Sequence, residues 1–161
     1  VLDVVLIKDP SPNVSHQRTV FLLAKLLDKY FSEKGFDGEL FISPLDVTLD
    51  EYSVVQPDLL YIENSQNEII KHERIDGIPH LIIEIISPSS AGRDRIVKMA
   101  KYQNSGVQHY WIVDPQDKTL ECYSLHDGIY ARVAGGIDSC IVEHPEFTNL
   151  KIDLGHLWCT A

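Results

Sequence analysis

The segment HLIIEIISPSSAGRDRIVKMAKY, residues 80–102, places one carboxylate inside the most hydrophobic run of the chain. Five large aliphatic side chains at 81–83 and 85–86 surround Glu84, and this run predicts a buried strand. An ionised carboxylate without partners in such a strand costs several kcal/mol. Glu84 must therefore reach water at an edge, pair with an Arg or Lys, or bind a metal ion together with another carboxylate.

The second half of the segment predicts a helix over 93–105, bounded by a proline and a glycine. Asp94, Lys98 and Tyr102 are spaced four apart and share one face of this helix. The helix follows the Glu84 strand within a few residues, so a lysine on its inner face could reach the same site. The alternative is an exposed helix with an Asp94–Lys98 pair, which contributes only a few tenths of a kcal/mol.

Asp58 is the candidate second carboxylate. It follows a proline in the run VVQPDLLYI, residues 54–62, which predicts a second strand. Proline fits the start of a strand better than its centre, so the Asp58 side chain is expected where it can point into a cleft. If strands 55–62 and 80–87 are neighbours, Asp58 and Glu84 can face each other. Two carboxylates, completed by waters and a substrate phosphate, suit Mg²⁺ or Mn²⁺.

The rest of the chain predicts an α/β or α+β layered domain with a mixed sheet. Apolar residues at helical spacing predict a long first helix, and apolar runs separated by turn residues predict strands. The predicted elements are a helix over 11–34, an extended arm over 39–49 that is interrupted near Pro44, strands over 108–114 and 119–125, and a short helix near 154–159. Tyr110 and Trp111 fall within a strand and are expected in the core or in a dimer interface.

Charge and motifs disfavour several classes of protein. The formal net charge is −10, so the chain does not present a broad basic surface, and a phosphate ligand would need a local cationic cluster or a metal ion. No GxSxG, GxxxxGK[ST], GxGxxG or HExxH motif occurs, which disfavours a serine hydrolase, a nucleotide-binding enzyme and a zinc hydrolase. Three dispersed cysteines and the lack of a membrane-length apolar run favour a cytoplasmic location, away from a membrane.

Four motifs together resemble the Uma2 family, a large group of bacterial, especially cyanobacterial, proteins also known as a domain of unknown function, DUF820. They are PD at 57–58, ExI at 84–86, RDxxxK at 93–98 and GVxxYWIVDP at 106–115. The resemblance implies the fold of the PD-(D/E)xK nuclease superfamily, a restriction-endonuclease-like mixed β-sheet flanked by helices. It further implies a single domain over 1–161, without the N-terminal helical segment of a full-length relative, and a homodimer.

The resemblance also implies a metal-dependent endonuclease that hydrolyses phosphodiester bonds, with DNA as the expected substrate. Asp58 and Glu84 match the two acidic residues of the superfamily and would hold Mg²⁺ or Mn²⁺, with the backbone carbonyl of Ile85 as a third ligand. The superfamily lysine would fall at position 86, which is isoleucine, and Lys98 would take its place. The remaining expected site residues are His16, Asp46, Asp94 and Tyr102 as supporting groups, and Arg93 and Arg95 as contacts to the nucleic-acid backbone.

Two alternatives remain open. One is a nuclease fold that no longer cuts and acts as a binding or assembly module, which the substituted lysine position and the acidic charge favour. The other is a structural domain in which Glu84 forms a buried ion pair with Lys98 or Arg95. His16 and Asp46 also have plainer interpretations, as a surface or capping residue and as a turn residue.

Overall fold

The computed structural model describes residues 13–87 and 91–158 of the protein. Its elements, in chain order, are α1 (Val14–Glu33), β1 (Glu39–Ile42), β2 (Val47–Asp50), β3 (Ser53–Val55), β4 (Leu59–Ile62), the short helix η1 (Asn64–Ile69), β5 (Ile75–Asp76), β6 (Leu81–Ile85), α2 (Ala91–Ser105), β7 (His109–Asp114), β8 (Thr119–His126), β9 (Ile129–Ile137), β10 (Ile141–Glu143), β11 (Lys151–Asp153) and the short helix η2 (Leu154–His156).

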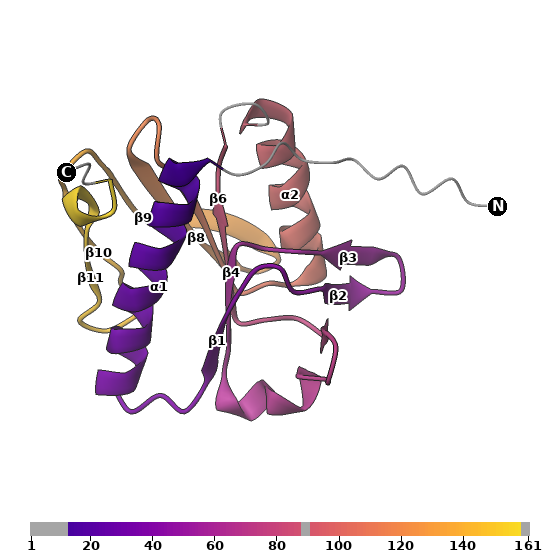
Figure 1. Ribbon diagram of the computed structural model, residues 1–161. Helices are drawn as coiled ribbons and strands as arrows, with labels where there is room; N and C mark the ends of the chain where they lie inside the picture. Colours follow the sequence, from indigo (N-terminus) through magenta and orange to yellow (C-terminus); the bar gives the residue numbers. More distant parts are fainter. Residues whose placement is uncertain (1–12, 88–90, 159–161) are drawn as a thin grey trace.

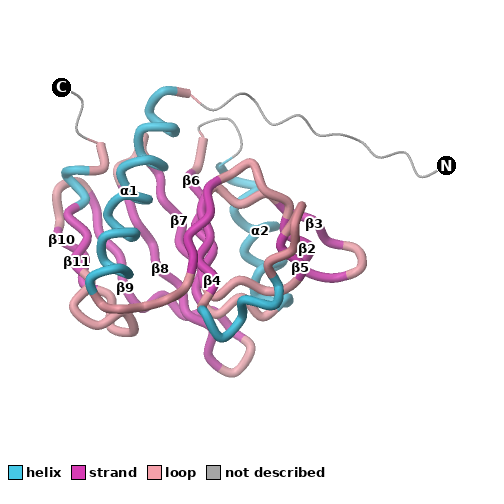
Figure 2. Tube along the Cα trace, turned by 60° about the horizontal axis from the view of Figure 1, so that its bottom comes forward, coloured by secondary structure: helices cyan, strands magenta, loops and turns pink. Residues whose placement is uncertain are grey.

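A six-stranded mixed sheet, in the order β1-β4-β6-β7-β8-β9, forms the middle layer. On one side of it lie α1 and the β10–β11 hairpin, and on the other lie α2 and the small β3-β2-β5 sheet (Figures 1 and 2). Each face of the large sheet has its own hydrophobic core. Trp111 is buried in the first core and Tyr110 in the second, as expected for core aromatic residues. The predicted mixed sheet flanked by helices is therefore confirmed.

The strand that carries Glu84, β6, lies in the interior of the sheet. It pairs antiparallel with β4 and parallel with β7, to which the chain returns through α2. Side chains along a strand alternate between its two faces. Leu81, Ile83 and Ile85 enter the core on the α1 side, whereas Ile82 enters the core on the α2 side. Glu84 shares the face of Ile82, so its carboxylate points towards the α2 layer.

The first helix begins at Val14, because the side chain of Asn13 caps it by accepting the backbone N–H of His16 at 2.8 Å. The predicted helix over 11–34 is confirmed over 14–33, and its first two predicted residues lie outside the described part of the chain. The cap places His16 in the first turn of α1, on the buried face of the helix. Among residues 13–87 and 91–158, no helix is long and apolar enough to cross a membrane.

Two predicted extended segments are each divided by a turn. The arm over 39–49 becomes β1 and β2, which belong to different sheets. The predicted strand over 54–62 becomes β3 and β4 on either side of Pro57, which has no N–H to offer to a ladder. The predicted terminal helix is the short η2, and the hairpin before it, β10–β11, was not predicted.

Candidate active site

Asp58 and Glu84 meet at one end of the β4–β6 pair. Leu59 pairs with Ile83, so one further step of the same antiparallel register sets Asp58 opposite Glu84. The backbone N–H of Ile85 donates a hydrogen bond to Asp58 Oδ2 at 2.8 Å. The Asp58 carboxylate is thus fixed to the strand that carries Glu84, as the sequence predicted for neighbouring strands.

The Glu84 carboxylate is held by two side chains of α2. The Tyr102 hydroxyl donates to Oε1 at 2.6 Å, and the Lys98 ammonium lies 3.3 Å from Oε2. Burial raises the pKa of Glu84 to about 7; Lys98 opposes this shift and the charge of Asp58 adds to it. Burial and the neighbouring Glu84 raise the pKa of Tyr102, so its hydroxyl stays protonated and remains a donor. The predicted convergence of helix and strand is present in the structure.

His16 reaches the same site from α1. Its Nε2 lies 3.3 Å from Asp58 Oδ1, and the residue is 8% exposed. The hydrogen bond to Asp58 raises the pKa of His16 against the opposing effect of burial, and the Asp58 charge, the Ile85 carbonyl and the Glu84 charge add to the increase. The interpretation of His16 as a surface or capping residue is wrong, because Asn13 is the cap and the imidazole faces the acid pair.

The donor set fits a hard divalent cation. Asp58, Glu84 and the Ile85 carbonyl offer oxygen atoms, which Mg²⁺ and Mn²⁺ prefer to nitrogen or sulfur. The His16 imidazole interacts with Asp58 and with the Ile85 carbonyl, so two of these oxygen atoms already have a positively polarised ring beside them. Burial raises the pKa of Glu84 and the charge of Asp58 adds to the rise, so a cation bound beside the pair would favour its ionised form.

Two predicted site residues have other partners. The exposed Asp46 side chain accepts a hydrogen bond from Gln56 Nε2 at 2.7 Å. Arg95 forms an ion pair with Glu121 of β8, not with Glu84. The side chains of Arg93 and Asp94 fall outside the described part of the structure, so their predicted roles stay predictions.

Arg95, which the sequence predicts as a contact to a nucleic-acid backbone, lies near Arg132, which it does not predict, two strands from Glu84. Glu84 is in register with Ile112, and Ile112 with Glu121, which sets the two glutamates about 10 Å apart on one face of the sheet. Arg132 Nη1 lies 4.0 Å from Glu121 Oε1, opposite Arg95. Both arginines line a pocket of about 550 Å³ over β8 and β9. This pocket is a candidate contact for the backbone of a nucleic acid.

Comparisons with known proteins agree with this geometry. Residues 3–155 match the model of the Uma2 family, which is described as "Putative restriction endonuclease". A solved structure described as a "putative nuclease belonging to DUF820", from Anabaena variabilis ATCC 29413, superimposes with a TM-score of 0.73. The two sequences are 18% identical over 94% of this chain and 84% of the other, so this likeness concerns the fold. Among curated proteins, none matches the chain.

Proposed function

The chain belongs to the Uma2 family, and on that premise we propose that it is a Mg²⁺- or Mn²⁺-dependent endonuclease that cuts the phosphodiester backbone of DNA. The observation that carries this proposal is the convergence of Asp58, Glu84 and Lys98 at one end of the central strands. Two acid groups and an amine are the groups that metal-assisted phosphodiester hydrolysis needs. The family description supports a nuclease, whereas the metal, the DNA substrate, the homodimer and the cytoplasmic location are parts of the proposal.

The acid pair is the proposed metal site, with the Ile85 carbonyl as the third protein ligand. A divalent cation held there would neutralise charge on the scissile phosphate and lower the pKa of a bound water. His16 and the Ile85 N–H fix the orientation of Asp58, and Tyr102 fixes that of Glu84. Such outer partners hold ligating groups in the geometry that binding requires.

Lys98 is the proposed electrostatic group. Its amine lies against Glu84, and its side chain is 39% exposed, so it faces both the acid pair and incoming substrate. An ammonium in this position can donate hydrogen bonds to a phosphate oxygen or to the attacking water, and it stabilises negative charge that develops during hydrolysis. Lys98 would thereby perform the role of the lysine that is expected at position 86, where this chain has isoleucine.

The backbone of the DNA would extend from the acid pair towards the pocket lined by Arg95 and Arg132. Glu121 holds both guanidinium groups in place and neutralises part of their charge. Arginine is suited to bidentate contact with phosphate. These contacts would position the duplex and carry no sequence information.

Removing one of these arginines is expected to weaken DNA binding at every sequence alike. Arg132→Ala should reduce the slope of log affinity against log salt by about one, because one phosphate contact is lost. Fluorescence anisotropy with a labelled duplex measures the slope, in an Asp58→Asn background that keeps the DNA intact. Lys29→Ala, on the exposed face of α1, is the matched control. An unchanged slope in Arg132→Ala would remove the pocket from the proposed DNA path.

The proposed function is tested by a cleavage screen. Wild-type protein and Asp58→Asn are incubated with Mg²⁺ or Mn²⁺ and with supercoiled DNA, linear duplex, single-stranded DNA and RNA. Metal-dependent cleavage of DNA by the wild type alone is the expected result. Cleavage of RNA alone would change the proposed substrate. Intact substrates with both metals would favour a nuclease fold that binds without cutting, and a metal titration would then show whether Asp58 still binds the ion.

A further inference from the structure

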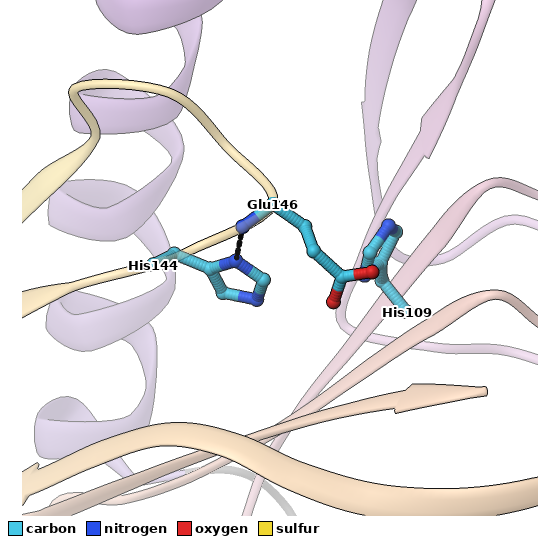
Figure 3. A group of neighbouring side chains, drawn as sticks. All are labelled: His109, His144 and Glu146. Atoms are coloured by element: carbon cyan, nitrogen blue, oxygen red, sulfur yellow. Dashed lines mark hydrogen bonds between the residues drawn. The ribbon is translucent and has the colours of Figure 1, made fainter. Parts of the chain in front are cut away.

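A second cluster of ligating side chains lies on the opposite face of the sheet. His109 begins β7, His144 follows β10, and Glu146 lies in the turn between β10 and β11. One ligand atom from each lies within 4.8 Å of the others, and Figure 3 shows the Glu146 carboxylate between the two imidazole rings. His109 pairs with Leu81, three residues before Glu84, so the cluster is about 10 Å along the sheet from the acid pair.

The two imidazoles are buried and rigidly packed. His109 and His144 are 4% and 3% exposed, and both rings pack against Phe147, while the His144 ring stacks on Trp111. Burial, with some contribution from neighbouring histidines, lowers the pKa of His109 to about 3, and burial also lowers the pKa of His144. Both rings are therefore neutral at physiological pH, which is the form that binds a metal.

One atom of the cluster has no partner. His144 Nδ1 accepts the backbone N–H of Glu146 at 3.1 Å, but His144 Nε2 is buried and has no hydrogen-bond partner within the described residues. Buried polar atoms are normally paired, so an unpaired one in a native structure calls for an explanation, such as an absent ion. His109 Nδ1 is already engaged with Ser124 Oγ at 3.1 Å, which leaves its Nε2 as the available ligand atom.

We propose that His109, His144 and Glu146 bind one Zn²⁺ ion, which clamps the C-terminal hairpin onto the central sheet. Two neutral imidazoles and one carboxylate suit zinc better than Mg²⁺, which prefers an all-oxygen shell. A tetrahedral site with bonds of about 2.0–2.1 Å needs ligand atoms about 3.4 Å apart, so the cluster must contract slightly. Glu146 is exposed, but its Oε1 also lies 3.9 Å from His126 Nε2, so binding would draw it from that contact; a water molecule completes the tetrahedron.

Zinc binding through His144 Nε2 has a structural consequence. The ring must carry its proton on Nδ1, so the backbone N–H of Glu146 can no longer donate to that atom. Glu146 lies in an exposed turn, where its amide can turn to water. The Nδ1–H of the buried ring then needs an acceptor of its own, and the coordinate bond must offset the loss of this hydrogen bond at both groups. His144 also lines a pocket of about 500 Å³ beside the hairpin.

The function of such a site would be to hold the β10–β11 hairpin against the central sheet. The β10–β11 hairpin pairs with no strand of the large sheet and is held to it by apolar packing on the α1 side. The ion would add coordinate bonds between β7 and the turn that joins the hairpin strands. Because zinc binds the folded site better than the unfolded chain, it should stabilise the protein.

The test uses Zn²⁺ and Co²⁺ alone, in the Asp58→Asn/Glu84→Gln background, so that the acid pair does not compete. We expect one equivalent of zinc to bind, tetrahedral Co²⁺ absorption, and a rise in Tm of about 5 °C or more at zinc concentrations well above Kd. The amide resonance of Glu146 should shift on binding. Glu146→Gln, which changes an exposed side chain, should weaken zinc binding by about tenfold or more, and His144→Ala by more than that.

His156→Ala is the matched control, because His156 is exposed and pairs with Asp153 at 3.6 Å in η2. Zinc affinity that is unchanged in both Glu146→Gln and His144→Ala would overturn the proposal, as would the absence of binding in the background variant. Octahedral Co²⁺ absorption would also contradict it. None of these readouts depends on DNA cleavage, so a negative result for zinc binding would not contradict the proposed nuclease activity, and the reverse also holds.

Discussion

Glu84→Gln is expected to lower the rate of DNA cleavage by about a thousandfold or more, while the fold is kept. Glutamine preserves the volume of the side chain and an oxygen that accepts the Tyr102 hydroxyl, so the α2 packing survives. It removes the negative charge that would hold the cation next to Asp58. Single-turnover cleavage in excess Mg²⁺ measures the loss, and Glu33→Gln, at the exposed end of α1, is the control.

The same substitution distinguishes a catalytic carboxylate from a structural one. Burial raises the pKa of Glu84 from 4.5 to about 7, so the folded state binds this proton more tightly than the unfolded state does. The stability that the proton contributes is complete below pH 4.5 and is lost as the pH rises through about 7. At about pH 8, Glu84→Gln should therefore equal or exceed the wild type in its free energy of unfolding, by up to about 3 kcal/mol.

Urea denaturation of both proteins in a chelator checks this result. The difference between them should shrink at about pH 5, where Glu84 in the folded wild type carries its proton. A loss of about 3 kcal/mol or more in Glu84→Gln at alkaline pH would contradict the expectation. It would show that the Glu84–Lys98 contact stabilises the fold as a buried ion pair, and the structural alternative would gain support.

The acid pair was predictable because its determinants are local. A carboxylate within a run of aliphatic residues is visible in the sequence, and the proline before Asp58 fixes where the next strand begins. The sequence left open whether the two strands are neighbours, and the structure pairs β4 with β6 although β5 lies between them in the chain. Lys98 and Tyr102 followed from helical spacing, since residues four apart share a face.

Other parts of the site could not be read from the sequence, because they depend on contacts between distant segments. His16 faces Asp58 only because α1 packs with its first turn at the end of β4. Arg95 of α2 pairs with Glu121 of β8, a contact between distant segments that the spacing along α2 does not predict. The seven histidines appear scattered along the chain, yet the return of the β10–β11 hairpin brings His144 next to His109. No pattern within a short stretch of sequence predicts that the hairpin packs next to β7.

Lys98→Met is expected to lower the rate of the cleavage step by about a hundredfold to a thousandfold. Methionine keeps most of the apolar stem, so packing along α2 changes little, whereas the charge next to Glu84 is lost. Removing that ammonium takes away an effect that lowers the pKa of Glu84, so the pKa of Glu84 should rise further. Assays at alkaline pH keep Glu84 ionised in both proteins. The remaining decrease in rate is then due to the missing ammonium itself.

The pattern of kinetic constants separates two roles for this amine. If Lys98 stabilises charge in the transition state, kcat falls while Mg²⁺ affinity is kept or increased, because a cation next to the metal ligands has been removed. If Lys98 only orients Glu84, Mg²⁺ binding weakens and excess metal restores the rate. Lys29→Met, an exposed lysine of α1 that pairs with Glu33, is the control. Full activity in Lys98→Met at alkaline pH would show that another group supplies the positive charge.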